Sequence, residues 1–157
     1  MQPPSLYGHF PSKNAIYDAM FAQGWEAWNH ERDSMTDRPP TGQRARLIAT
    51  ALAYFDFAVA DPERYLLMNV RTVPGFAPSA NAFQPAVQSY ERMRRDLLHH
   101  TQDDLDVLTA LIAGLISQQL ANDPGGQRWR RLLPRVMSSF ADDLGLPPDP
   151  HQNGATS

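Results

Sequence analysis

The amino-acid sequence predicts an all-α protein. Apolar residues recur three and four positions apart in several segments, which is the spacing of one helix face. Proline, glycine and N-capping residues separate these segments, and strand signals are absent. At 157 residues the chain is long enough to bury a core of its own. We therefore expect a bundle of about seven helices.

The first part of the sequence predicts a short helix followed by a long one. The segment 3–10 ends at a proline, and Ser12 then stands as the N-cap of a helix over 13–32. Two prolines and a glycine predict a loop over 36–42. Apolar residues on a single face predict the next helix over 43–60.

The middle of the sequence predicts two more helices with a loop between them. Asp61 followed by Pro62 combines an N-cap with a proline at the first helical position, which predicts a helix over 62–69. Prolines and a glycine predict a loop over 71–82. We expect a helix to resume near Pro85 and to continue to residue 100.

Two further helices are predicted before the tail. Thr101 with Asp104 resembles a capping box and predicts a helix that reaches about residue 122. The last helix is predicted over 127–144, with Pro134 as a kink inside it and Gly145 as its C-terminal cap. The polar composition of residues 146–157 predicts a disordered tail.

Composition narrows the class of protein. The chain has no cysteine, which excludes disulfides and thiolate metal sites and favours a reducing, cytoplasmic compartment. The formal net charge of −3 weighs weakly against nucleic-acid binding, although an acidic body can mask a small basic head. The most apolar stretch, 105–116, is interrupted by Asp106 and Thr109 and is short for a membrane span, and no signal peptide is visible. We expect a cytoplasmic protein with no membrane partner.

The most specific motif lies near the N-terminus. Residues 6–16 match the pattern Leu-Tyr-x-His-Phe-x-x-Lys-x-x-Leu, with isoleucine in place of the last leucine. The matching residues are Leu6, Tyr7, His9, Phe10, Lys13 and Ile16. This segment resembles the end of the helix-turn-helix of TetR-family transcriptional regulators and the helix after it. The resemblance implies a TetR-like helical bundle with a partial helix-turn-helix head and a C-terminal ligand-binding and dimerisation domain. Two helices that precede the recognition helix in that family have no counterpart here, and we interpret Met1 as an internal methionine of a longer protein.

The resemblance also implies which residues contact operator DNA. Tyr7 and His9 would lie at the end of a helix that enters the major groove, and Lys13 begins the next helix, where free backbone N–H groups favour a phosphate. Base edges would be contacted near the start of the recognition helix, by Gln2, Pro3, Pro4 and Ser5. Without the motif, such side chains are most often surface or packing residues.

Softer similarity to a common type of TetR ligand domain continues through the segments 60–68, 73–76, 114–126 and 128–129. The resemblance therefore implies three regions. These are a partial DNA-binding head over 1–34, a ligand-binding and dimerisation domain over 41–145 and the tail over 146–157.

Aromatic and methionine side chains in the middle helices indicate a ligand pocket. A small-molecule site needs apolar walls with a few polar groups, and in this family the corresponding helices surround one cavity. The predicted ligand-binding residues are Trp25, Trp28, Tyr54, Phe57, Tyr65, Met68, Phe76, Phe83 and Tyr90, with Gln119 or its neighbour Gln118 as a polar anchor. For any single one of these side chains, a place in the ordinary core is the alternative.

The helix predicted to begin at Thr101 is apolar around most of its circumference, which indicates two buried faces, one of them against a second copy of the chain. We expect it to pair with the last helix in a four-helix bundle about a two-fold axis. The predicted interface residues are Leu108, Leu111, Ile112, Leu115, Trp129, Leu133, Val136, Met137 and Phe140.

The leading hypothesis is a homodimeric repressor of TetR type that a small apolar or amphipathic effector releases from a palindromic operator. The alternative is a helical dimer that binds a small ligand but no DNA. No catalytic or cofactor-binding motif is present, and His99 and His100 lack the spacing of a metal site, so we expect no enzyme, cofactor or metal. The run Arg92, Arg94 and Arg95 is interpreted as a solvated helix face.

Overall fold

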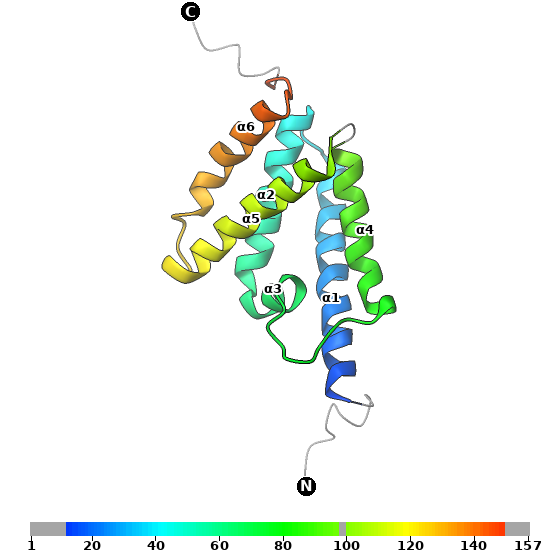
Figure 1. The fold of residues 1–157 in the computed structure, drawn as a ribbon. Helices are drawn as coiled ribbons and strands as arrows, with labels where there is room; N and C mark the ends of the chain where they lie inside the picture. The colour runs from blue at the N-terminus through cyan, green and yellow to red at the C-terminus, as the bar shows by residue number, and fades with distance from the viewer. Residues whose placement is uncertain (1–11, 98–99, 150–157) are drawn as a thin grey trace, which may run out of the picture.

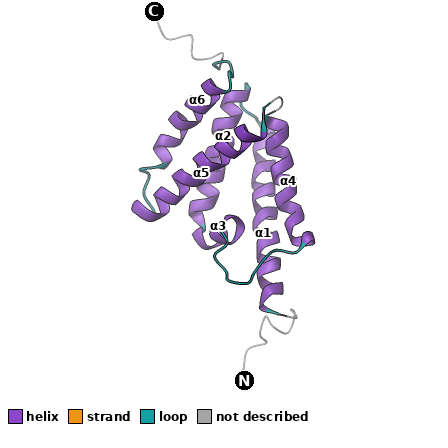
Figure 2. Ribbon diagram, in the orientation of Figure 1, coloured by secondary structure: helices purple, strands orange, loops and turns teal. Residues whose placement is uncertain are grey.

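The computed structural model describes residues 12–97 and 100–149. Within these ranges every regular element is helical, as Figure 2 shows, so the predicted all-α class is confirmed. The α-helices are α1 (Lys13–Ser34), α2 (Gln43–Ala60), α3 (Pro62–Asn69), α4 (Ala80–Asp96), α5 (Gln102–Asn122) and α6 (Leu133–Asp143), and the short 3-10 helices are η2 (Met35–Asp37) and η3 (Arg130–Leu132). The short helix predicted over 3–10 lies outside the described residues.

The long helices are arranged in two groups that share α2. In Figure 1, α1 and α4 lie side by side and run in the same direction, and α2 runs the opposite way. The short α3 lies at the end of α2 and contacts α1. On the other side, α5 crosses α2, and α6 runs back along α2.

Helix boundaries set by capping residues agree with the sequence predictions. The Ser12 hydroxyl accepts a hydrogen bond from the Ala15 N–H at 3.1 Å, and α1 starts beside it. Thr101 and Asp104 form a complete capping box at the start of α5. Gly145, with a φ of 70°, ends α6 in the left-handed conformation that glycine adopts without strain.

The start of α4 differs from its prediction. The helix begins at Ala80, before Pro85, and Ser79 is its N-cap. Asp18 on α1 fixes this cap, because its carboxylate accepts hydrogen bonds from the Ser79 N–H at 2.7 Å and the Ser79 hydroxyl at 2.5 Å. The Ser79 hydroxyl also accepts from the Ala82 N–H at 3.2 Å, so the cap itself is local, and Pro85 is carried inside the helix. The helix also ends at Asp96 rather than near residue 100.

The predicted kink at Pro134 is wrong. Residues 130–132 form the separate 3-10 helix η3, and α6 begins at Leu133. Pro134 is therefore in the first turn of α6, where a backbone N–H has no helical partner to lose.

The prediction of disorder from residue 146 is wrong for residues 146–149. Leu146 is buried, and its N–H donates to the Ala141 carbonyl at 2.9 Å. Arg44 at the start of α2 donates to the carbonyls of Ser138, Leu146 and Pro147 and pairs with Asp142 at 2.5 Å. The guanidinium thus anchors this segment to α2.

Two groups of buried side chains hold the bundle together. The larger lies between α2, α5 and α6, where Phe55, Ile116, Leu133 and Met137 are almost completely buried. Burial of each such side chain contributes roughly 1.5–3 kcal/mol. A smaller group around Phe21 joins α1 to α4. The helix α1 is therefore packed into the body of the molecule.

Among the described helices, α5 alone is long and apolar enough to pass as a membrane span, with a mean hydropathy of 1.2. Core packing accounts for part of this composition, since Leu105, Leu108 and Ile116 are buried against the rest of the chain.

Candidate functional site: a cavity between the helices

A cavity of about 320 Å³ lies between α1, α2, α4 and α5, with residues of α3 at one end. This volume is at the lower end of the range of about 300–1,000 Å³ that small-molecule sites occupy. Its walls are mainly apolar, and they include Trp28, Leu47, Ala51, Leu108 and Ile112.

Three aromatic rings form one part of the wall. Trp28 packs edge-on against Tyr54 with ring centroids 4.8 Å apart, and Tyr54 lies 6.5 Å from Tyr65. Such edge-to-face contacts stabilise aromatic pairs beyond the burial of their area. The rings come from α1, α2 and α3, so the wall depends on the packing of all three helices.

The α3 end of the cavity contains two phenols. The Tyr54 hydroxyl donates to the Asn69 side-chain oxygen at 2.9 Å, and burial raises the pKa of Tyr54 well above its usual range. Burial also raises the pKa of Tyr65, whose side chain is buried and whose hydroxyl has no hydrogen-bond partner among residues 12–97 and 100–149. An unused phenol in an apolar cavity is a ready donor or acceptor for a ligand.

The opposite end of the cavity is charged. Arg32 is buried, forms an ion pair with Asp96 and donates to the Ser89 carbonyl at 3.4 Å. Burial lowers the pKa of the Arg32 guanidinium, Asp96 opposes this effect, and Arg92 adds to it. The only strongly buried cation in the described ranges therefore borders the cavity.

Half of the predicted ligand-binding residues border this cavity. These are Trp25, Trp28, Tyr54, Tyr65 and Tyr90.

The other predicted ligand-binding residues do not line it. Phe57 is covered by Arg64, whose guanidinium carbon lies 3.8 Å from the ring centroid. Met68 packs against Gly24 of α1, where a Cβ would lie 2.7 Å from the methionine sulfur. Gln119 is buried, but its side chain accepts from the Trp129 N–H at 2.9 Å and donates to Asp123, so it holds the turn after α5.

Phe76 and Phe83 lie outside the cavity for a related reason. The Phe76 ring is 5.6 Å from that of Tyr17, and the Phe83 ring is 5.7 Å from that of Phe21. Both rings pack on the N-terminal half of α1, and Phe83 remains 46% exposed.

The polar side of the cavity was not predicted from the sequence. Arg32, Thr50, Ser89 and Asp96 border it, and none of them was a predicted site residue. One signal was present, because Trp25, Trp28 and Arg32 are spaced by three and four along one helix face. The partners of Arg32 on α4 give no such signal, since they are far away in the sequence.

Several predicted interface residues belong to the chain's own core. Leu108, Leu133, Met137 and Phe140 are buried against α2, α5 and α6, so their burial needs no second copy. Ile112 borders the cavity. Leu111, Leu115, Trp129 and Val136 remain partly exposed at the surface of α5, η3 and α6.

Lys13 is the predicted DNA contact that the structure describes. It is exposed and begins α1, beside the cap formed by Ser12. The remaining predicted DNA contacts lie outside the described residues, and these are Gln2, Pro3, Pro4, Ser5, Tyr7 and His9.

The arginine run on α4 is only partly solvated. Arg94 and Arg95 are exposed, whereas Arg92 pairs with Asp33 of α1 at 2.6 Å. No group of three potential metal-ligating side chains occurs in the part of the chain that the structure describes.

Comparison of this chain with protein-family models, with curated proteins and with solved structures found no match.

Proposed function

We propose that this protein is a ligand-responsive DNA-binding regulator of TetR type, acting as a repressor that a small effector releases from its operator. The observation that carries the proposal is the course of α1. The helix begins with Lys13 of the Leu-Tyr-x-His-Phe-x-x-Lys motif and also supplies Trp25, Trp28 and Arg32 to the cavity wall. One rigid element thus joins the DNA-contact motif to the ligand site.

Coupling in this proposal is a shift between two conformations. A ligand that fills the cavity better in one arrangement of α1 and α4 favours that arrangement, and only the difference between its two affinities drives the shift. Because α1 and α4 are tied by Asp18, Asn29 and Arg32, a change at the cavity is transmitted along α1 as a whole.

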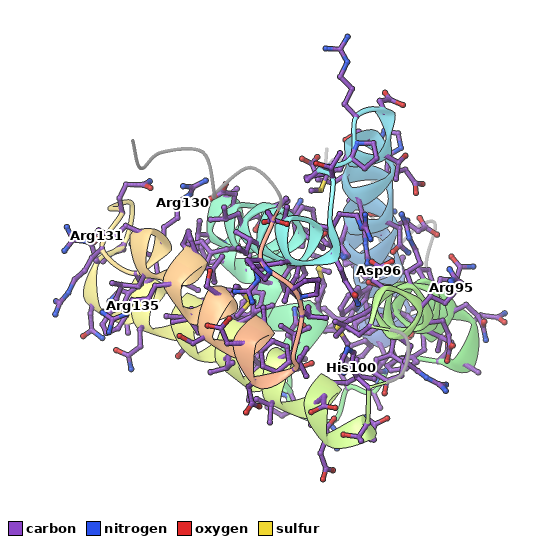
Figure 3. All side chains as sticks on the ribbon, turned by 90° about the horizontal axis from the view of Figure 1, so that it is seen from above. Arg95, Asp96, His100, Arg130, Arg131 and Arg135 are labelled. Carbon is purple, nitrogen blue, oxygen red and sulfur yellow. The ribbon has the colours of Figure 1, made fainter. Side chains whose placement is uncertain are left out.

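A homodimer is part of the proposal, because a palindromic operator presents two equivalent half-sites. A shallow groove between α5 and α6 is lined by Val107, Leu111, Val136 and Arg135, and Val107 is 47% exposed. Charge favours a second copy of the chain there. Figure 3 shows Arg131 and Arg135 at one end of this surface, whereas the neighbouring Arg130 is paired with Asp56 of α2 at 2.6 Å.

Acidic residues lie at the other end of this surface, where α5 begins with Asp103 and Asp104 and α6 ends with Asp143, while Asp142 is paired with Arg44 of α2. A two-fold axis across the helices would place the basic end of one copy against the acidic end of the other. Such pairing steers association and fixes the orientation of the two copies.

The test is an anisotropy titration of labelled DNA from the region upstream of the gene. It uses the 157-residue chain and a form extended by any in-frame codons before Met1. We expect the extended form to bind this DNA more tightly than an unrelated duplex. We expect Lys13→Ala to weaken its binding to both duplexes and to reduce the salt dependence by about one unit per half-site.

Arg38→Ala removes an exposed cation outside the motif and is the matched control. If neither form prefers the upstream DNA, the regulator is the wrong conclusion. The dimer that only binds a ligand, which the cavity supports on its own, then becomes the better description.

A further inference from the structure

The charged end of the cavity contains more positive than negative charge. Arg32 and Arg46 both border it, and Asp96 is the single carboxylate among its lining residues. Arg46 is exposed and has no ion-pair partner in the described part of the chain. The lining therefore contains two arginines and one carboxylate.

The pair between Arg32 and Asp96 is asymmetric. The side chain of Arg32 is 8% exposed, whereas that of Asp96 is 64% exposed. Burial disfavours the charge of Arg32, and the one carboxylate that offsets this effect is largely solvated. A second anion that reached Arg32 from inside the cavity would be less hydrated than Asp96 and would form stronger hydrogen bonds.

We propose that the cavity binds an amphipathic monoanion, with its carboxylate at Arg32 and Arg46 and its apolar body against Trp28, Tyr54 and Leu47. The inference rests on the proposed function only in treating the cavity as a ligand site. The free hydroxyl of Ser89, which is buried and has no side-chain partner among the described residues, is a further donor for the same head group.

The aromatic wall alone would also suit a lipophilic cation, because ring faces attract positive charge. The charged end decides between the two classes. A cation would meet two guanidinium groups for one carboxylate, so its head group is repelled where an anionic head group is attracted. A neutral ligand would leave the charge of Arg32 unchanged.

Anion binding would act on the contact between α1 and α4. Asp96 pairs with Arg32 through its side chain, and its carbonyl accepts from the Gln43 side chain at 2.9 Å. A ligand carboxylate that replaces Asp96 at Arg32 loosens the end of α4 from α1. An anionic ligand therefore changes the contact between α1 and α4, whereas a ligand that leaves the pair of Arg32 and Asp96 intact does not.

The proposal is tested by calorimetry on the full chain with three ligands that share one alkyl chain length but differ in head-group charge. These ligands are decanoate, decan-1-ol and decyltrimethylammonium. We expect decanoate to bind at least about tenfold more tightly than decan-1-ol, as charge-assisted hydrogen bonds imply, and the cation to bind least tightly. Equal affinities for decanoate and decan-1-ol, or tightest binding of the cation, would overturn the inference.

Two variants separate a head-group contact from a structural role. Arg46→Gln should weaken decanoate about tenfold and leave decan-1-ol unchanged, whereas Asp96→Asn should strengthen decanoate because it removes the competing carboxylate. Arg94→Gln changes an exposed arginine outside the cavity lining and is the control. Weaker decanoate binding by Asp96→Asn would contradict the exchange at Arg32.

The result of this calorimetric test does not depend on whether the protein binds DNA. Decanoate binding with these variant effects supports the inference even if the anisotropy titration shows no preference for the upstream DNA. Failure of all three probes to bind overturns it, whatever that titration shows.

Discussion

Tyr54 is the residue whose surroundings have the clearest energetic consequence. Its ring lies between Trp28 and Tyr65, and its hydroxyl donates to Asn69. Because burial raises the pKa of Tyr54, the folded protein keeps this phenol neutral at pH values where the unfolded chain ionises it. The stability linked to Tyr54 is therefore complete below the ordinary tyrosine pKa of about 10 and is lost as the pH rises above it.

We predict that Tyr54→Phe destabilises the protein by about 1 kcal/mol at pH 7.5, through the lost hydrogen bond to Asn69. At pH 10.5 the wild type should lose about 0.8 kcal/mol that the variant retains, since only the wild type has this phenol to ionise on unfolding. Urea unfolding at both pH values measures the difference. If the stability difference between the two proteins is the same at both pH values, the phenol of Tyr54 does not stay neutral in the folded protein.

At the same scale, the sequence indicated the aromatic part of the site better than its polar part. Trp25, Trp28 and Tyr54 could be predicted because apolar spacing marks the inner face of a helix. The contact of Arg32 with Asp96 joins residues 64 positions apart, and no local pattern encodes it. Phe57 was misassigned because the arginine that covers it belongs to the next helix.

Most helix starts were predictable because their N-caps are local. Ser12, Asp61 and Thr101 each bond to a backbone N–H three residues on, so the sequence contains the whole signal. The cap of α4 is equally local, since the Ser79 hydroxyl accepts from the Ala82 N–H, but the prolines around it predicted a loop instead. Prolines misled because their effect depends on how far into the helix they fall.

The capping box at the start of α5 is expected to stabilise the protein. The backbone N–H and the hydroxyl of Thr101 both donate to the Asp104 carboxylate. These hydrogen bonds hold the pKa of that carboxyl below its usual range. We predict that Thr101→Ala costs about 1 kcal/mol of stability and raises the pKa of Asp104 toward its ordinary value. NMR titration of the carboxyl and urea unfolding measure the two effects.

Thr101→Ser keeps the hydroxyl and is the matched control. Because folding lowers the pKa of Asp104, its carboxylate stabilises the folded protein fully above the ordinary aspartate pKa. This stability is lost as the pH falls through the pKa that Asp104 has in the folded protein. If Thr101→Ser and Thr101→Ala behave alike, the hydroxyl is not the group that stabilises the helix end.

For the whole molecule, the exposed surface of α5 and α6 raises the question of assembly. We predict a homodimer in sedimentation equilibrium at micromolar protein, with association weakened by Val107→Glu because the substitution buries an unpaired charge in the groove. Val87→Glu on α4 is the control, since Val87 is also exposed, at 39%, but lies outside the groove. Arg135→Glu should also weaken the dimer.

Raised salt should weaken the wild-type dimer, because the proposed pairing joins opposite charges at the surface. A wild-type protein that is monomeric at these concentrations would contradict the interface and, with it, the two-fold part of the proposed function.

The anchoring of the last described segment by Arg44 has a consequence for the order in which the chain is made. The carbonyls that Arg44 binds belong to residues 94 to 103 positions further along, so they leave the ribosome long after α2 does. Until then the Arg44 guanidinium is solvated, and the start of α2 has no packing partner on that side. Contacts of such sequence separation are slow to form. Closure of the bundle at this end is therefore a late step of folding, which cannot finish before the segment that follows α6 has been made.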